Sequence, residues 1–506
     1  MTDKPAQDSA RERDAQAEPG QAHPGPQNHD PTHSRVADNG GSDGGVVHSG
    51  QTRPATVQPP PPRAWRWHWQ WPLRLRPVSP RQKAARPAQQ LQQFLVRLGG
   101  ALVSTGIAVT DIKRTLQNAA VTLGAPDAVI VVLPTAVFVG VPGEQETRID
   151  VSDAASGEVL FDRAALVSSI AQRAISGTLT AGDGLQALDA AERSRPRFRW
   201  PLRVLGHGTI ALGVALVLSG ASVASLVLTF VLGLLVGGMK LLVRPGSYAA
   251  VLLPTVSAFV ISLVAFLAAD WGIAREPIWV LVPALVTLLP GGVLTVAVQE
   301  LASGDMMAGA SRLVYGVAQL VFLAFGILTA NVVVGLPDWF ALSSSGSVVG
   351  QYAAWIGVVL MSVGFFLYFC GPRFSLYYLL FTLLIAYGGQ LLGDWVGQLA
   401  SGTAGGGTIG GGLFGAFLLT LVAYLAQSLP SAPPAVVSFL PAFWLLVPGA
   451  AGLIGLTQSA SDTAATITIE GIGASLVAIA IGVLVGTAAY RIVYRFAPER
   501  WHLRLV

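Results

Sequence analysis

The sequence after Pro201 is a succession of apolar segments, each close to the ~20 residues that a helix needs to cross the hydrocarbon core of a bilayer. Ten such segments occur, near residues 203–219, 222–239, 246–268, 277–297, 309–333, 351–370, 374–390, 406–428, 434–456 and 468–493. Only 12% of all residues are charged, whereas a soluble domain carries about 25%. The sequence therefore predicts an α-helical polytopic membrane protein with about ten transmembrane helices.

One stretch within these segments is written twice. Residues 283–291 read PALVTLLPG, and residues 441–449 read PAFWLLVPG. At the offset of 158 residues that relates them, residues 256–305 align with 414–463 without a gap, and 15 of 50 positions are identical. The identities include Pro283 with Pro441, Pro290 with Pro448, and Gly291 with Gly449. An internal repeat of this kind indicates a transporter built from two related membrane halves.

The charges between the segments predict the orientation. With ten helices, one side carries the basic residues Arg195, Arg197, Arg199, Arg203, Lys240, Arg244, Arg312, Arg373, Arg491, Arg495, Arg500 and Arg504. The other side carries Arg275 and the acidic residues Asp270, Glu276, Asp338, Asp394 and Asp462. The positive-inside rule then places both termini in the cytoplasm. Each half, 201–335 and 350–494, holds five segments, and because five is odd we expect two inverted repeats.

The segments outside the membrane part differ in composition. Residues 1–88 are rich in Pro and Gly and are expected to be disordered, because they hold too little apolar surface to offset the entropy of ordering. Their end, 63–86, interleaves Trp with Arg, which suits binding to anionic lipid at the membrane interface. An unstructured basic linker is the alternative. Residues 495–506 form a basic C-terminal tail.

Residues 89–195 are predicted to be a small cytoplasmic α+β domain. Apolar residues recur at helical spacing from Leu91 to Leu98, and Thr110 is placed to cap a second helix that ends at Gly124. Strands are expected at 128–133, 136–141 and 146–151, and two more helices near 162–175 and 181–191. The short linker Arg193–Trp200 would let this domain cover the cytoplasmic mouth of the membrane part.

The two Pro-Gly pairs are the candidate binding site. Proline removes a backbone donor, and glycine lets the chain leave helical angles, so each pair should break its helix and free carbonyl groups. A break at the same place in both halves is typical of transporter binding sites, although ordinary kinks inherited from a duplicated ancestor remain an alternative. The expected substrate-binding residues are Pro290, Gly291, Gln299, Ser303, Pro448, Gly449, Gln458 and Ser461.

Acidic residues beside the breaks are the candidate proton- or ion-coupling groups. These are Glu300, Asp305 and Asp462, because an ionisable group at a membrane span is a functional hypothesis by default. Solvated loop charges are the alternative. For His207 we favour interfacial anchoring, and for Lys240 close helix packing beside Gly237-Gly238.

Several function classes are disfavoured. No Walker motif and no Gly-x-Ser-x-Gly elbow occur, so neither ATP-driven transport nor a triad hydrolase is supported, and we expect no enzyme. Cys370 is the only cysteine, and five of the seven histidines are scattered through the tail. We therefore expect no metal site, no cofactor and no nucleic-acid partner. Whether the chain forms a homo-oligomer stays open.

The sequence also resembles the threonine/serine exporter family of bacteria. The resemblance rests on Leu98–Gly106 (LGGALVSTG), Val109–Leu116 (VTDIKRTL) and Val129–Thr135, with Pro290-Gly291 through Arg312 and Phe439–Gly449 in the membrane halves. It extends over about residues 90–500. Asp111 matches a polar position of the family's soluble signature, where we expect it to cap or pair within the domain.

The resemblance implies export of threonine and serine across the bacterial plasma membrane, driven by the membrane potential or a proton gradient. It also implies that both halves lie on one chain, as in actinobacterial members of the family. Split relatives are associated with dicarboxylate export, so an exporter of dicarboxylates such as succinate is an alternative. A membrane-anchored enzyme or regulatory module is a third reading.

Overall fold

The computed structural model describes residues 80–142, 148–153, 160–218, 222–274, 277–335, 350–402, 404–427, 433–446 and 465–495. Residues Leu75–Val506 form one compact unit. Most of the lipid-binding segment predicted at 63–86, and the C-terminal tail from 496, lie outside the described residues. The first helix begins at Pro80, so the last part of the expected disordered tail is helical.

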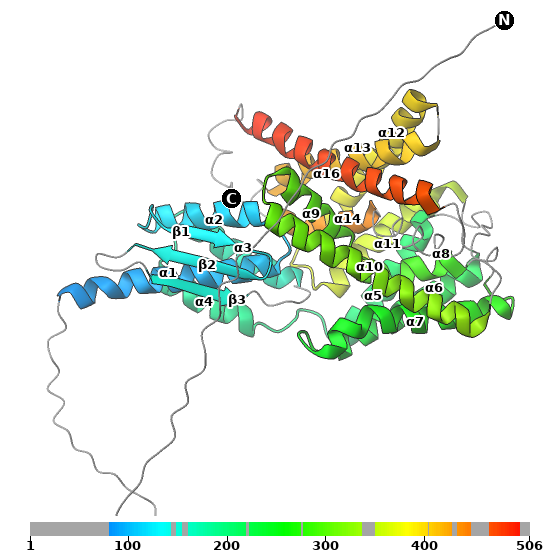
Figure 1. Cartoon of the computed structure of the whole chain (residues 1–506), viewed down its shortest axis with the longest axis horizontal. Coiled ribbons are helices and arrows are strands. Elements are labelled where there is room, and N and C mark those ends of the chain that lie inside the picture. The colour runs from blue at the N-terminus through cyan, green and yellow to red at the C-terminus, as the bar shows by residue number, and fades with distance from the viewer. Residues whose placement is uncertain are drawn as a thin grey trace, which may run out of the picture. The chain divides into compact units, whose positions relative to one another are not determined.

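The first part of the described chain is an α+β region, Pro80–Arg193 (Figure 1). Its elements are α1 (Pro80–Ser104), α2 (Val109–Thr122), β1 (Val129–Val132), β2 (Ala136–Val141), β3 (Arg148–Asp153), α3 (Phe161–Ile175) and α4 (Ala181–Arg193). The strands form an antiparallel sheet in the order β1-β2-β3, with Val131 opposite Phe138 and Phe138 opposite Val151. The helices and strands expected from sequence periodicity are thus all present.

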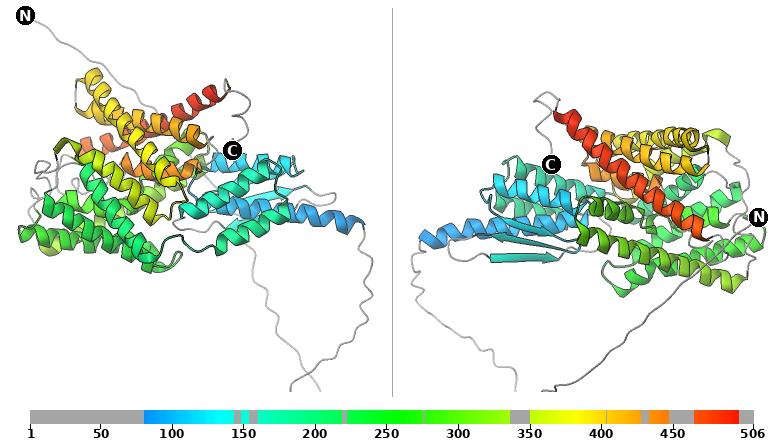
Figure 2. Two further views of the ribbon diagram at one scale, coloured as in Figure 1. Left: turned by 180° about the vertical axis from the view of Figure 1, so that it is seen from behind. Right: turned by 45° about the horizontal axis from the view of Figure 1, so that its top comes forward.

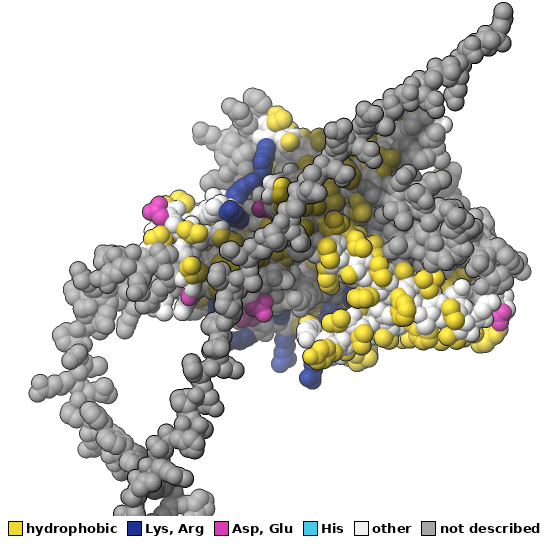
Figure 3. Space-filling view, viewed as in Figure 1, with side chains coloured by type: hydrophobic (Ala, Val, Ile, Leu, Met, Phe, Trp, Pro, Cys, Tyr) yellow, Lys and Arg dark blue, Asp and Glu magenta, His cyan; other side chains and the backbone are white. Residues whose placement is uncertain are grey.

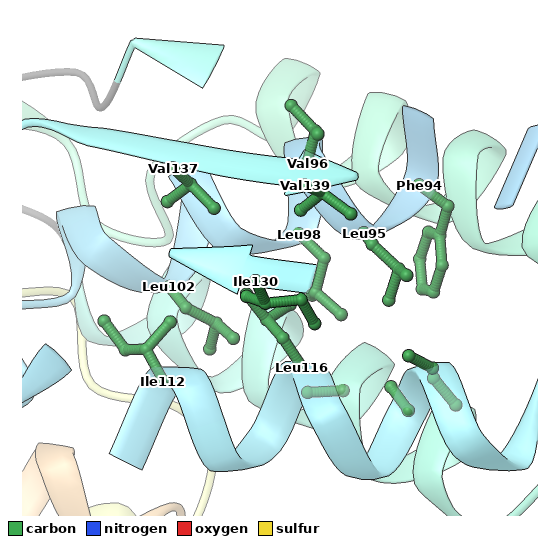
Figure 4. Close-up of a cluster of buried hydrophobic side chains, with 14 of the residues drawn as sticks. Phe94, Leu95, Val96, Leu98, Leu102, Ile112, Leu116, Ile130, Val137 and Val139 are labelled. Carbon is green, nitrogen blue, oxygen red and sulfur yellow. The ribbon is translucent and has the colours of Figure 1, made fainter. Parts of the chain in front are cut away.

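Alternation along the strands explains how the helices cover the sheet. In β1, Ile130 and Val132 are buried, whereas Val129 and Val131 are exposed, so one face of the sheet is covered. Figure 4 shows side chains of α1 and α2 meeting those of β1 and β2 in this core. Gly99 lets α1 approach the sheet closely, because a Cβ there would lie 2.7 Å from a methyl group of Val137.

The second part of the described chain is a set of apolar helices. Its elements are α5 (Trp200–Leu218), α6 (Val223–Leu242), α7 (Tyr248–Asp270), α8 (Pro277–Ala284), η1 (Val286–Leu288), α9 (Gly291–Ala302), α10 (Met306–Val334), η3 (Gly350–Tyr352), α11 (Ala353–Tyr368), α12 (Ser375–Ser401), α13 (Ala404–Gln427), α14 (Ala435–Leu445) and α16 (Ala465–Arg495).

Among the described residues, seven helices contain segments long and apolar enough to cross a membrane: α5, α6, α7, α10, α12, α13 and α16. The structure is therefore that of a multi-pass membrane protein. The fourth expected segment is divided into α8, η1 and α9, and the sixth holds the 16-residue helix α11. The ninth begins with α14 and continues beyond the described residues. The total of ten spans stays a prediction.

Glycine residues line the contact between α5 and α11. A Cβ at Gly213 would lie 2.7 Å from the carbonyl oxygen of Gly357, and one at Gly206 would lie 2.9 Å from that of Gly364. Because the later glycine of α5 meets the earlier one of α11, the two helices run in opposite directions. Such small-residue contacts let membrane helices approach at backbone distance.

Corresponding helices of the two halves make similar pairs. In the first half α7 packs along α10 and α6 against α8, and in the second half α13 packs along α16 and α12 against α14. Helix α16 also packs against α9 of the first half (Figure 2). These pairs fit the expected inverted repeat, which remains a prediction.

The outer surface of α7 and α10 is apolar. Hydrophobic side chains dominate the face that Figure 3 shows over these helices. Exposed members include Val251 and Val256 of α7 and Val314, Val321 and Phe325 of α10. In a water-soluble protein such a continuous apolar face would be anomalous, whereas lipid is its natural environment.

Candidate functional site

The predicted break at Pro290-Gly291 is present. Helix α8 ends at Ala284, the 3₁₀ turn η1 covers Val286–Leu288, and α9 begins at Gly291. Three consecutive carbonyls at the break accept hydrogen bonds from side chains of other helices. Lys240 Nζ donates to the oxygen of Thr287 at 3.4 Å, Gln319 Nε2 to that of Leu288 at 2.6 Å, and Trp444 Nε1 to that of Leu289 at 3.4 Å. Protein donors therefore bind these three carbonyls of the break.

The bond from Trp444 joins the two copies of the repeated stretch. Trp444 belongs to 441–449, and Leu289 belongs to 283–291. Leu440 of α14 also lies near Gly292. A Cβ added at Gly292 would lie 3.3 Å from a methyl carbon of Leu440. The end of the first copy thus lies against the middle of the second.

A cavity of about 400 Å³ lies next to this junction. Its walls come from α1, α2 and α3 of the α+β region and from α9, α10, α13, α14 and α16 among the apolar helices. Its volume is within the ~300–1,000 Å³ typical of small-molecule sites. Polar and charged lining residues include Asp111, Arg114, Asn118, Gln299, Thr487 and Arg491.

The cavity brings opposite charges together. Asp111 Oδ1 lies 3.6 Å from Arg114 Nη1, and the Asp111 side chain is still 39% exposed because it borders the cavity. Although the side chain borders the cavity, the surrounding protein partly desolvates it; this raises the pKa of the Asp111 carboxyl above its ordinary value, and the charges of Arg114 and Arg491 partly oppose the rise. The pocket therefore offers one carboxylate and the guanidinium groups of Arg114 and Arg491 to a bound molecule, while Arg312, a third lining arginine, faces Glu300.

Glu300 and Asp305 hold the α+β region against the apolar helices. Glu300 is fully buried, its Oε1 accepts a hydrogen bond of 2.9 Å from the backbone N–H of Val109, and its Oε2 lies 3.2 Å from Nε of Arg312. That Nε–H is not aligned with Oε2 for a hydrogen bond, so charge attraction holds this pair. Asp305 Oδ2 accepts a 2.7 Å bond from the hydroxyl of Thr110.

These contacts correct the expected cap of α2. Thr110 lies inside the helix, and Ala108 occupies the N-cap position without any side-chain cap. Instead, the Glu300 carboxylate, 191 positions away, binds the first free N–H of the helix. A negative charge at a helix N-terminus is favourable because the exposed N–H groups make that end positive.

The structure places the predicted substrate-binding residues in different surroundings. Gln299 lines the cavity, Pro290 and Gly291 are buried beside it, and Ser303 is exposed at the end of α9. The remaining predicted site residues lie outside the described part of the chain: Pro448, Gly449, Gln458, Ser461 and Asp462.

His207 and Lys240 differ from their sequence-based interpretation. His207 is not an interfacial anchor, because its side chain is fully buried and both ring nitrogens are hydrogen-bonded. Lys240 does more than end a packed helix, since it binds the break at Thr287.

Sequence reasoning missed the charged residues of the cavity. From the sequence, Arg491 indicates only the orientation of the helices, and Asp111 is expected to cap or pair within the α+β region. The available signal was that Arg491 falls inside the last apolar segment, where an ionisable residue is expected to be functional. Nothing local indicated that Asp111 would face it, because the two lie on elements 380 positions apart.

Comparison with known proteins supports an exporter. Residues 93–334 match the family model described as "Putative threonine/serine exporter". A protein of Mycobacterium tuberculosis described as "Probable threonine/serine exporter" is 25% identical over 253 residues, which are 49% of this chain and 45% of that protein. A protein of Schizosaccharomyces pombe described as uncharacterized is 29% identical over 255 residues, 49% of this chain and 30% of that protein.

The matched stretches thus span less than half of either curated relative. No solved structure matches the chain. The family match includes α2, the break at Pro290-Gly291 and the Glu300–Arg312 pair, and so includes one side of the cavity. Over residues 93–334, a little less than half of its length, the chain is similar to the threonine/serine exporter family.

Proposed function

We propose that the chain exports small polar amino acids, threonine and serine, across the bacterial inner membrane as a secondary-active transporter with both termini in the cytoplasm. The observation that carries this proposal is the cavity in which Asp111 lies with Arg114 and Arg491. An amino acid carries one carboxylate and one ammonium group at neutral pH. A pocket with both signs of charge is complementary to it.

The charges suggest how the substrate would lie. Its carboxylate would bind Arg491, because a guanidinium is a planar donor suited to carboxylates. Its ammonium would bind Asp111. The hydroxyl of threonine or serine would meet polar groups of the wall, such as Asn118 and Thr487. The α+β region would then cover the cytoplasmic mouth of the path and supply one wall of the site.

The helix break would connect this site to alternating access. Helix α9 begins at Gly291, and its first turn lines the cavity through Gly292 and Val293. A shift of α9 at Pro290-Gly291 would change the cavity directly. The predicted binding residues Pro290, Gly291, Gln299 and Ser303, with Pro448, Gly449, Gln458 and Ser461 in the second half, stay part of this proposal.

A dicarboxylate such as succinate is the second candidate substrate. The observation in its favour is that three arginines, Arg114, Arg312 and Arg491, line the cavity against one acid, and only Arg312 faces a second carboxylate, that of Glu300. Asp111 decides between the candidates, because its carboxylate attracts an ammonium and repels a second carboxylate. We favour the amino acid because Asp111 borders the open space.

The test uses the full chain in lipid vesicles with labelled threonine, serine and succinate. We expect the unaltered protein to transport threonine and serine, and Asp111→Asn to reduce this by about tenfold, which corresponds to ~1.4 kcal/mol. Lys113→Gln is the control, because Lys113 is exposed on the same helix. Transport of succinate alone by the unaltered protein would refute the amino-acid proposal and favour the dicarboxylate.

A further inference from the structure

A buried hydrogen-bonded chain of three side chains lies at the helix break. Lys240 Nζ is 2.9 Å from Thr287 Oγ1, and Thr287 Oγ1 is 2.7 Å from Nε2 of His207. Nδ1 of His207 is 2.7 Å from the carbonyl oxygen of Gly233. The three residues come from α6, η1 and α5, so the chain ties the break to two membrane helices.

The carbonyl of Gly233 fixes the direction of these bonds. A carbonyl oxygen only accepts, so Nδ1 of His207 carries a proton and donates it. In a neutral imidazole Nε2 then accepts, which requires the Thr287 hydroxyl to donate to it. The same hydroxyl oxygen accepts from the Lys240 ammonium. The bonds therefore run in one direction, from Lys240 through Thr287 to His207.

We propose that Lys240, Thr287 and His207 form a one-proton relay that couples proton movement to export. This inference rests on the proposed function of a secondary-active exporter. It differs from the coupling role predicted for Glu300 and Asp305, whose oxygens bind the α+β region in this structure.

The proton transfer is balanced within the three residues. An N–H bond of the Lys240 ammonium breaks as its proton passes to Thr287 Oγ1, and the original O–H bond of Thr287 breaks as that proton passes to Nε2 of His207. Lys240 becomes a neutral amine that accepts from Thr287, and His207 becomes an imidazolium that donates to Thr287. The cluster carries one positive charge in either state.

The surroundings favour a single shared charge. Arg203 of α5 lies with its guanidinium carbon 5.6 Å from the ring centre of Tyr368, and Lys240 Nζ lies 5.3 Å from the same centre. The Tyr368 ring also stands edge-on to His207, with 5.1 Å between ring centres. An ammonium and an imidazolium together beside Arg203 would repel strongly in this buried place, because the local dielectric is low.

The chemistry of the cluster favours a proton over a metal cation as its cargo. Hard metal cations such as Ca²⁺ and Mg²⁺ require several oxygen ligands, whereas Lys240 is itself a cation. Among the residues that the structure describes, no group of three or more His, Cys, Asp or Glu side chains is arranged to hold a metal ion. Lys240 is half-buried and His207 fully buried, so Lys240 is the end nearer to solvent.

The break transmits the state of the relay to the cavity. Thr287 belongs to the 3₁₀ turn that precedes Pro290, and α9 after it lines the cavity. Trp444, bound to the carbonyl of Leu289, belongs to α14, which also lines the cavity. If the hydrogen bonds at Thr287 reverse, the conformation of this turn would change. Both α9 and α14, which line the cavity, are attached to the turn and would be affected.

The test separates coupling from substrate passage. Full-length protein in vesicles of phosphatidylethanolamine and phosphatidylglycerol is assayed for threonine–threonine exchange without a gradient, and for threonine uptake driven by an acidic interior. Thr287→Val removes the hydroxyl at nearly constant shape, and Thr287→Ser restores it. Thr229→Val is the matched control, because Thr229 is also a buried threonine and its hydroxyl binds the Ser225 carbonyl of its own helix.

We expect Thr287→Val to lower gradient-driven uptake at least about 100-fold, the lower end of the effect that a positioned proton transfer commonly has, while exchange continues. Thr287→Ser and Thr229→Val should keep both activities. Unchanged driven uptake by Thr287→Val overturns the relay. Loss of exchange together with driven uptake also overturns it, because Thr287 would then serve substrate passage or folding.

A second measurement tests the relay independently of whether the proposed substrate is correct. Nitrogen NMR of ¹⁵N-histidine-labelled protein, with His207→Asn to assign the signal, should show a buried ring protonated on Nδ1 and not on Nε2 at neutral pH. Thr287→Val should shift the Nε2 signal. A ring protonated only on Nε2 contradicts the inference. Absence of threonine and serine exchange in the unaltered protein, with this signal present, contradicts only the proposed function.

Discussion

Glu300 joins the two parts of the described chain at the level of single atoms. One carboxylate oxygen binds the N-terminus of α2, and the other faces Arg312, whose Nη2 donates to the carbonyl of Ile107 at 3.4 Å. The pair thus binds the turn before α2 twice: Glu300 accepts from its N–H at Val109, and Arg312 donates to its carbonyl at Ile107. Its side chains are 0% and 11% exposed, so the charges are poorly screened.

Replacement of Glu300 should weaken the docking of the α+β region. In Glu300→Gln, Arg312 keeps its charge in a buried place without its partner, and breaking one side of such a pair typically costs about 3–5 kcal/mol. We expect a lower melting temperature in detergent and faster amide hydrogen exchange in the first turn of α2. Glu300→Gln combined with Arg312→Gln should recover part of the loss. A single variant as stable as the unaltered protein would show that the pair does not hold the domain.

Asp111 should make transport sensitive to cytoplasmic acidification. Its folded-state pKa lies above the ordinary value because of burial. The carboxylate therefore takes up a proton at a higher pH than a solvated aspartate as the pH falls, and the ammonium site is lost. The raised pKa also means that the ionised form costs the folded state stability, a cost that disappears as the pH falls through this pKa.

We therefore expect the rate of threonine transport to fall as the pH is lowered, with the midpoint of the fall at a pH above the pKa of an ordinary aspartate. In Asp111→Asn this acid limb of the pH profile should be absent. Initial rates across the acid range check the expectation. A limb that persists in Asp111→Asn would assign the titration to another group.

At the scale of elements, the break between α8 and α9 could be predicted, and the groups that satisfy it could not. Pro290 and Gly291 are local signals that act on their own backbone. Lys240, Gln319 and Trp444 bind the freed carbonyls from three other helices. Only the packing of those helices brings them together, and no periodicity in the sequence encodes that packing.

The close crossing of α5 and α11 should depend on its glycines, which have no side chain to separate the helices. In Gly213→Ala the new Cβ would lie 2.7 Å from the oxygen of Gly357 and 2.8 Å from the nitrogen of Met361, so the helices must separate. We expect a loss of about 1–3 kcal/mol, as for other overpacked sites. Gly388→Ala in α12 is the control, because nothing lies within 4 Å of its added Cβ. Equal melting temperatures for both variants would contradict the close crossing.

At the scale of the whole molecule, the elements of the α+β region were predictable and its docking was not. The alternation in β1 and the helical spacing of Leu91, Leu95 and Leu98 record which faces are buried, so periodicity was enough. The contacts of Thr110 with Asp305 and of Val109 with Glu300 join positions nearly 200 residues apart. Interpreted locally, Thr110 was a plausible cap, and Glu300 and Asp305 were plausible coupling groups or loop charges.

The proposed orientation can be checked with single cysteines in a Cys370→Ala background. We expect a membrane-impermeant maleimide added to intact cells to label Trp271→Cys, which lies in the exposed turn after α7. Lys113→Cys in α2 should react only after lysis. The reverse pattern would place the α+β region outside the cell and contradict the positive-inside prediction.

The cavity between the α+β region and the apolar helices is the feature on which the proposed function depends, and substrate protection tests it most directly. Asn118 lines the cavity and is exposed, so Asn118→Cys in the Cys370→Ala background can be modified by a small thiol reagent. We predict that threonine and serine slow this modification, that succinate does not, and that Lys113→Cys is unaffected by any of them. Modification of Asn118→Cys at the same rate with and without threonine, in protein that still transports it, would show that the substrate binds elsewhere.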